Sequence, residues 1–212
     1  MSAPEPPAGT GAELLDALAS AALAAVRPIE FRTTQSPEEL EGAFQLRHRV
    51  AVEGGLIRPE ELPGGLERDN HDDVALQLAG WDGSTLVATI RLVFGTPDRK
   101  LPTEELFDAL IEPGERVVDW GRLSIAPEYR DHEHRMFWAV IGAAWLVSRA
   151  RGFRLVVGTS SGEMIDRYRA AGFPIKVLGP PRWHWGKFRY PMIMDPAEID
   201  TSAGKATPSL TV

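Results

Sequence analysis

The stretch RVVDWGRLSIAPEYR, residues 116–130, decides the fold of this chain. Residues 116–125 form an apolar run that predicts a strand, and Gly121 within it indicates a bulge or a close backbone approach. Beyond the stretch, apolar residues recur at the helical period from Met136 to Trp145, and Gly152 is placed to cap that helix. The sequence therefore predicts a central strand that leads through a turn into a helix.

The same signals, followed outward from this stretch, predict the remaining elements. Ser36 and Pro37 are a helix N-cap and first helical position, and Asp82-Gly83 is a hairpin turn between two apolar runs. The expected strands are 29–33, 74–81, 86–94, 116–125, 155–158, 175–178 and 188–194, and the expected helices are 12–26, 37–52, 106–111, one from 136, and 161–171. This order belongs to the α/β (α+β) class, with a central mixed β-sheet flanked by helices.

Length and composition fit one folded domain with two tails. The chain has 212 residues, of which 43% are hydrophobic and 25% charged, a balance typical of a single globular domain. Residues 1–28 are expected to be a flexible N-terminal segment with a possible helix, because residues 1–11 are mostly Pro, Ala and Gly. Residues 29–195 are expected to fold as one domain, and residues 196–212 to form a disordered tail.

Charge and composition argue against several classes of protein. The net charge of −7 and the pI near 5.3 would repel nucleic acid. The chain has no apolar run of about 18 residues, no basic secretory leader and no cysteine, so we expect a cytoplasmic protein without an integral membrane span. His132 and His134 flank Glu133, but no remote third ligand accompanies them, so no metal site and no bound cofactor are expected.

The order of elements resembles the GCN5-related N-acetyltransferase (GNAT) superfamily. Residues 122–130 resemble the family's central strand followed by V-x-P-x-x-R, and residues 168–173, YRAAGF, match its Y-x-x-x-G-F motif. The resemblance implies a GNAT acyl-CoA N-acyltransferase fold in which the backbone around Leu123, Ser124 and Ile125 holds the donor's pantetheine. It also implies that Arg130 binds a donor phosphate and that Tyr168 protonates the departing thiolate. Solvent exposure of Arg130 and core packing of Tyr168 are the alternative roles.

One loop departs from the GNAT pattern. GNAT enzymes bind the pyrophosphate of coenzyme A with the backbone amides of a Gly-x-Gly loop, whereas residues 131–135 here are DHEHR. Two of these side chains, Asp131 and Glu133, are negative. The departure favours acyl carrier protein over coenzyme A as the co-substrate that delivers the acyl group, because the carrier lacks the nucleotide part of coenzyme A.

A second set of residues resembles acyl-homoserine lactone synthases and the related N-acyl amino acid synthases. The residues that carry this resemblance are Leu46-Arg47, Glu67-x-Asp69-x-x-Asp72, Arg91 and Asp119-Trp120-Gly121-Arg122. In that subfamily an acyl chain passes from acyl carrier protein to an amine. Autoinducer synthases enclose S-adenosylmethionine with aromatic residues after the first arginine, but residues 50–57 here contain none. An amino acid or another small amine is therefore favoured as acceptor.

These charged residues have two readings. As site residues, Glu67, Asp69, Asp72 and Asp119 would fix an ammonium group or accept its proton, and Arg47, Arg91 and Arg122 would bind substrate. As structural residues, the arginines would neutralise the carboxylates in a buried salt-bridge network. Both readings are compatible with one another.

The sequence thus predicts an enzyme, an N-acyltransferase that moves a medium or long acyl group from acyl carrier protein or acyl-CoA to the amine of an amino acid or related small molecule. An ordinary acetyl-CoA-dependent acetyltransferase and a non-catalytic acyl-thioester-binding module are the alternatives.

An acidic carrier would need a basic docking face, for which the candidates are Arg130, Arg135, Arg149, Arg151 and Arg154. A C-terminal aromatic cluster is a candidate wall for the acyl chain or a core edge: Trp183, His184, Trp185, Phe188 and Tyr190.

Overall fold

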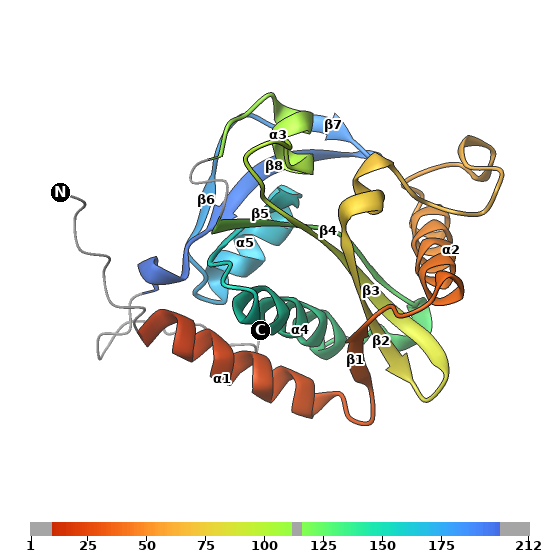
Figure 1. Ribbon diagram of the computed structural model, residues 1–212, viewed down its shortest axis with the longest axis horizontal. Helices are drawn as coiled ribbons and strands as arrows, with labels where there is room; N and C mark the ends of the chain where they lie inside the picture. The colour runs from red at the N-terminus through yellow and green to blue at the C-terminus, as the bar shows by residue number, and fades with distance from the viewer. Residues whose placement is uncertain (1–9, 112–115, 200–212) are drawn as a thin grey trace.

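A mixed eight-stranded sheet forms the centre of the molecule in a computed structural model that describes residues 10–111 and 116–199 (Figure 1). The strand order is β1-β2-β3-β4-β5-β8-β6, with β7 paired to β8. The strands are β1 (Glu30–Thr33), β2 (Leu76–Asp82), β3 (Thr85–Phe94), β4 (Val117–Ile125), β5 (Leu155–Ser160), β6 (Ile175–Val177), β7 (Arg182–His184) and β8 (Lys187–Met194). The α-helices are α1 (Thr10–Ala25), α2 (Pro37–Glu53), α3 (Pro102–Phe107), α4 (Arg135–Ala150) and α5 (Gly162–Ala170).

Most of the predicted elements are confirmed, because their boundaries depend on local signals. Ser36 caps α2 by accepting a hydrogen bond from the amide of Glu39 (3.3 Å), and the β2–β3 hairpin turns at Asp82-Gly83. The predicted helix at 106–111 is misplaced. The observed helix, α3, begins at Pro102. The Glu104 carboxylate accepts hydrogen bonds from the amide of Leu101 before the helix (2.8 Å) and from the amide of Ile111 after it (2.7 Å).

Several short elements were missed, among them the 3₁₀ helix Asn70–Val74 before β2 and the strand β7 (Arg182–His184). The 3₁₀ helix is closed by a capping box between Asp69 and Asp72, and β7 pairs with the strand that follows it, but both elements are too short to show a period. In the part of the chain that the structure describes, no helix is long and apolar enough to cross a membrane.

The N-terminal helix α1 packs into the core, which corrects the expectation of a flexible segment for residues 10–25. It lies along α4 in Figure 1, and Leu15, Ala19 and Ala22 are buried in the main hydrophobic cluster. Trp145 of α4 donates its indole N–H to Asp16 (2.8 Å). At the other end, Pro196–Glu198 form a 3₁₀ helix and Ile199 is buried, so these four residues are not part of a disordered tail. Residues 1–9 and 200–212 lie outside the described chain.

The two faces of the sheet differ in chemistry. Ile90 and Leu92 of β3 join the apolar cluster with α1 and α4. Arg91 lies between them in the strand and so faces the opposite side, where α2 contributes Arg47. One face therefore carries the main apolar core and the other a buried set of charged side chains.

The central strands β4 and β5 separate at the middle of the sheet. β4 and β5 pair in parallel from Val117↔Leu155 to Trp120↔Gly158, and within the described chain they are not paired beyond that point. Gly158 lies where the backbones come closest, since a Cβ there would be 2.7 Å from the Trp120 carbonyl oxygen. On its other side β4 has the expected bulge, just after Gly121, where the register with β3 shifts opposite Ile90. The separation leaves backbone groups of β4 available to a ligand.

Candidate active site

A cavity of about 500 Å³ lies where β4 and β5 separate. Its lining has both charged and apolar side chains, so it suits a substrate with both kinds of group. Nine of the predicted site residues line it: Arg47, Glu67, Asp69, Arg91, Asp119, Arg122, Leu123, Ser124 and Tyr168. Its apolar lining includes Leu56, Ile90, Trp120, Phe137, Ile141, Met164 and Met192.

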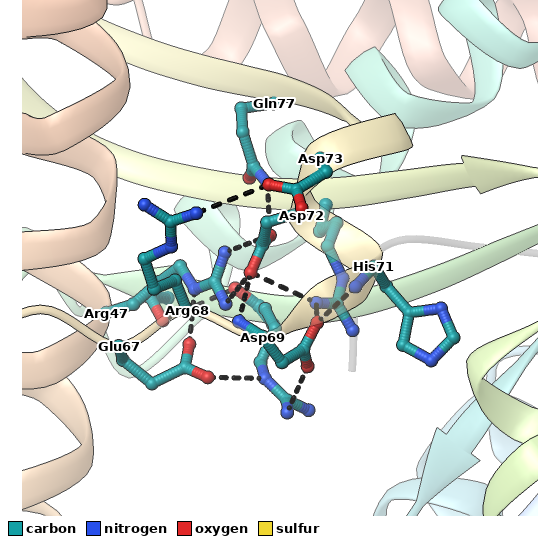
Figure 2. A network of polar contacts seen from close by, with 11 residues as sticks. Arg47, Glu67, Arg68, Asp69, His71, Asp72, Asp73 and Gln77 are labelled. Carbon is teal, nitrogen blue, oxygen red and sulfur yellow. Dashed lines mark hydrogen bonds and ion pairs between the residues drawn. The ribbon is translucent and has the colours of Figure 1, made fainter. Parts of the chain in front are cut away.

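Arg47 is the centre of the charged network beneath the cavity. Its side chain is 1% exposed and donates hydrogen bonds to Glu67 and, in a bidentate arrangement, to Asp72 (2.7 and 3.1 Å). Figure 2 shows these contacts beside the Asn70–Val74 helix, with Gln77 also donating to Asp72 (2.8 Å). An arginine this deeply buried is tolerated because carboxylates surround it.

Two further arginines complete the network from the sheet. Arg91 of β3 contacts Asp69 (2.6 Å) and Asp72 (3.3 Å), and Arg122 of β4 contacts Glu67 (2.9 Å) and Asp69 (3.0 Å). Asp72 also accepts a hydrogen bond from the amide of Asp69 (2.8 Å). Three arginines and three carboxylates therefore neutralise one another, so the predicted salt-bridge network is confirmed. The catalytic reading of these carboxylates stays a prediction.

Asp69 and Asp72 differ in exposure although both belong to this network. The Asp69 side chain is 28% exposed and lines the cavity, whereas the Asp72 side chain is 1% exposed and does not. Burial would raise the pKa of both carboxyls, but the neighbouring arginines outweigh it and hold both pKa values below the usual range. Both are therefore ionised near neutral pH, but only Asp69 can meet a ligand.

Asp119 is a buried carboxylate that no arginine pairs directly in the described chain. It accepts a hydrogen bond from the amide of Thr103 (2.7 Å) at the start of α3 and lines the cavity. Burial raises the pKa of Asp119 to about 6, against the opposing effects of the Thr103 hydrogen bond and the charges of Arg91 and His71. A carboxylate with this pKa can accept a proton near neutral pH.

Tyr168 of α5 lies at the apolar side of the cavity. Its ring packs edge-on against Trp138 (6.0 Å between centroids) and Phe173 (6.3 Å), so the predicted packing role is real. Its hydroxyl makes no hydrogen bond to the described residues, and burial raises the pKa of the phenol. The hydroxyl therefore stays protonated at neutral pH and is available as a donor.

Arg122 lies at the bulge of β4, and its side chain contacts the C-terminal hairpin. Its guanidinium carbon lies 4.5 Å from the centroid of the Trp185 ring. Both residues have left-handed backbone angles, with φ of 55° at Arg122 and 53° at Trp185. Non-glycine residues adopt such angles at a cost of about 1–3 kcal/mol, which is typical of sites where side-chain placement matters.

Three predicted site residues do not line the cavity. Asp72 and Ile125 are buried, and the exposed side chain of Arg130 donates to the carbonyl oxygen of Ile125 (3.0 Å). The turn Pro127–Tyr129 carries Arg130 away from the cavity. Its proposed contact with a donor phosphate stays a prediction.

Sequence reasoning missed seven polar residues of the cavity: Asn70, His71, Thr103, Glu105, Thr159, Ser160 and Arg189. His71 contacts Glu105 (2.7 Å), and Figure 2 shows its ring pointing away from the carboxylate cluster. A signal for His71 was available, since it lies between Asp69 and Asp72 in the acidic motif. Within the described ranges no group of three or more His, Cys, Asp or Glu side chains is arranged to hold a metal ion.

The start of α4 is already occupied by a carboxylate. Asp131 accepts hydrogen bonds from the amides of Arg135 (3.1 Å) and Met136 (3.3 Å). These first-turn amides are the groups that bind a phosphate at a helix N-terminus. The Asp131 carboxylate therefore occupies the position that a phosphate of a bound donor would need.

The open mixed sheet, its separated central strands and the cavity between them define a GNAT-like acyltransferase. The family model for the N-acyl amino acid synthase FeeM matches residues 42–194, and the chain belongs to that family. The protein is therefore an N-acyltransferase. A search of curated proteins finds no match.

Solved structures agree on the fold. One is the CoA-dependent acyl-homoserine lactone synthase MesI, with a TM-score of 0.64 and 21% identity over 81% of this chain and 90% of that one. Another is FeeM, an N-acyl amino acid synthase from uncultured soil microbes, with a TM-score of 0.60 and 13% identity over 80% and 92%. A third is the CoA-dependent synthase BjaI with SAM and isopentyl-CoA, with a TM-score of 0.58 and 23% identity over 78% of each chain.

Proposed function

We propose that the protein joins the acyl group of an acyl carrier protein to the amino group of an amino acid within the cavity between β4 and β5. The observation that carries this proposal is the cavity's division into a charged end at Asp69 and Asp119 and an apolar wall at Phe137 and Ile141. An amino acid is charged and an acyl chain is apolar, so the two substrates are complementary to the two ends.

The acceptor amine must lose a proton before or during attack. Asp119 is the group best suited to take it, because its raised pKa lies near neutral pH and it lines the cavity. The amine nitrogen then bonds to the thioester carbon, the carbon–sulfur bond breaks, and the departing thiolate takes a proton from the Tyr168 hydroxyl, which in turn regains a proton from solvent. Backbone groups of Leu123 and Ser124, in the part of β4 that is not paired with β5, would hold the pantetheine.

Apolar side chains continue beyond the main cavity. A second cavity, of about 50 Å³, shares Trp120, Ile141, Tyr168 and Met192 with the first and extends to Leu15 and Leu18 of α1. Its lining is apolar apart from the Tyr168 hydroxyl and the indole N–H groups. A chain longer than acetyl can therefore extend beneath α4, which favours medium or long acyl groups.

The carrier protein is favoured as donor by the occupied start of α4. Because Asp131 accepts from the first-turn amides, these amides are not available to the pyrophosphate of coenzyme A. Phosphopantetheine on a carrier protein has no pyrophosphate and does not need them. The MesI and BjaI structures are of CoA-dependent enzymes, so the donor must be tested directly.

The test is mass spectrometry of lipid extracts from a bacterial host that expresses this protein, compared with a host carrying the empty vector. We expect new N-acyl amino acids with acyl chains of medium or long length. Purified protein supplied with all twenty amino acids and either acyl carrier protein or coenzyme A thioesters would then identify the donor. Formation of N-acetyl products from acetyl-CoA alone, or binding of thioesters without any amide product, would overturn the proposal.

A further inference from the structure

The β7–β8 hairpin presents two different faces. Cross-strand neighbours share a face, and the pairs are Arg182↔Arg189, Trp183↔Phe188 and His184↔Lys187. Trp183 and Phe188 lie on one face, where they are 65% and 58% exposed. Arg189 and His184 lie on the other face and line the cavity. The hairpin therefore turns basic side chains toward the cavity.

Arg189 differs from the other arginines of the cavity. Arg47, Arg91 and Arg122 each contact at least one carboxylate at 3.0 Å or less. Arg189 is half-buried, and among residues 10–111 and 116–199 its side chain has neither an ion pair nor a hydrogen bond. A guanidinium has five donors, so a half-buried arginine with no acceptor on the protein is open to a ligand that supplies acceptors.

The neighbours of Arg189 are also basic. The charge of Arg122 acts on Arg189, and those of Arg122 and Arg189 act on His184. Burial lowers the pKa of Arg189 and of His184. The positive charge of Arg122 lowers both pKa values further, and that of Arg189 also lowers the pKa of His184. The charges of Asp69 and Glu67 oppose this effect at His184, but both carboxylates already contact Arg122. This end of the cavity therefore has an unbalanced positive charge.

We infer that Arg189, flanked by Arg122 and His184, binds the carboxylate of the amino-acid acceptor. A planar guanidinium matches a carboxylate through two parallel hydrogen bonds. Asp119 lines the same cavity and suits the acceptor's amine, so one cavity holds a partner for each charged group of an amino acid. This inference rests on the proposed function and assigns its acceptor class: a molecule with a free carboxylate, rather than a simple amine.

The test compares binding of free amino acids and of their carboxamides by isothermal titration calorimetry. The wild-type protein is expected to bind an amino acid at least about tenfold more tightly than its carboxamide, the size of one charged hydrogen bond. Arg189→Gln should bind the two forms equally, and Arg189→Lys should recover part of the preference. Arg182→Gln is the matched control, because Arg182 is the direct neighbour of Arg189 on the same face, contacts Asp108 (2.9 Å) and does not line the cavity.

Three outcomes would overturn the inference. In the first, Arg189→Gln keeps the wild-type preference for the free amino acid. In the second, it weakens binding of 4′-phosphopantetheine alone, which would place Arg189 on the donor. In the third, the wild-type protein binds no free amino acid. Formation of the amide product is measured separately and reports on the proposed function. If the protein forms the product but Arg189→Gln keeps the preference for the free carboxylate, only the role of Arg189 is refuted.

Discussion

Arg122 and Trp185 connect the central strand to the C-terminal hairpin across the cavity: the guanidinium carbon lies 4.5 Å from the indole ring centroid. They are separated by 63 positions in the chain, and each has a left-handed backbone angle, 55° and 53°. The same guanidinium contacts Glu67 and Asp69 on its other sides. The indole therefore helps to hold one charged wall of the candidate site.

Trp185→Ala should release Arg122 without unfolding the protein. A cation–π contact of about 0.5–2 kcal/mol corresponds to a loss of about two- to thirtyfold in kcat/KM for acyl transfer. Trp183→Ala is the control, since Trp183 is 65% exposed and does not line the cavity. Equal kinetics for the two variants in steady-state assays would argue against a positioning role for Trp185.

Asp119→Asn should lower kcat by about a hundredfold or more, because an amide cannot accept the amine proton. In the wild-type protein kcat/KM should rise through an apparent pKa near 6, and this rise should vanish in the variant. The measurement is a pH–rate profile from pH 5 to 8. An unchanged profile in Asp119→Asn would assign the proton to another group.

The same substitution has a predicted effect on stability. Burial raises the pKa of Asp119 in the folded state from 3.8 to about 6, so the folded state binds more protons between these values and the free energy of unfolding falls as pH rises through them. The loss amounts to about 3 kcal/mol for two pKa units. Asp119→Asn lacks this titration, so urea unfolding at pH 7 should find it at least as stable as the wild-type protein.

Asp69→Asn and Asp72→Asn should separate function from stability. Asp72 is buried against Arg47, so its neutralisation should cost about 3–5 kcal/mol of unfolding free energy. Asp69 lines the cavity and is partly exposed, so Asp69→Asn should reduce turnover with a smaller loss of stability. Chemical denaturation and steady-state kinetics on both variants check this. Parallel losses of folding and activity in Asp69→Asn would favour a purely structural network.

Two glycine substitutions should have opposite effects on stability. A Cβ on Gly142 of α4 would lie 2.9 Å from the Cα of Ala19, so Gly142→Ala should push α1 away and cost about 1–3 kcal/mol. A Cβ on Gly42 of α2 would meet only Leu86 Cδ2, at 3.6 Å, so Gly42→Ala should stabilise by about 0.5–1 kcal/mol through helix propensity. Thermal unfolding of both variants measures the difference. An unchanged melting temperature in Gly142→Ala would mean that α1 does not depend on this close contact.

Asp131→Ala should expose the first-turn amides of α4. We expect tighter coenzyme A binding, together with a loss of about 0.5–2 kcal/mol in stability because a helix cap is removed. Glu133→Ala is the control, since it removes a neighbouring charge without freeing these amides. If both variants bind coenzyme A like the wild-type protein in equilibrium titrations, Asp131 does not block the nucleotide.

Local signals were enough to predict most elements of the fold. The cap at Ser36, the turn at Asp82-Gly83 and the apolar periods act through residues close in the chain, so they can be read without the structure. The helix predicted at 106–111 was misplaced because hydrogen bonds from Leu101 and Ile111 to Glu104 fix the helix position, and such contacts leave no periodic pattern in the sequence. β7 was missed because a three-residue strand forms only by pairing with β8.

The sequence by itself determined the order of most elements and most of the charged residues that meet at the cavity. Only the tertiary structure decided what each residue does: Asp72 is enclosed by Arg47 and Arg91, and Asp69 lines the cavity. Only the tertiary structure also brought Arg189 to the cavity, where it has no partner in the described chain. The reason is physical. Residue type and spacing act over a few positions, whereas burial and ion pairing depend on strand register and on segments 20 to 55 positions apart.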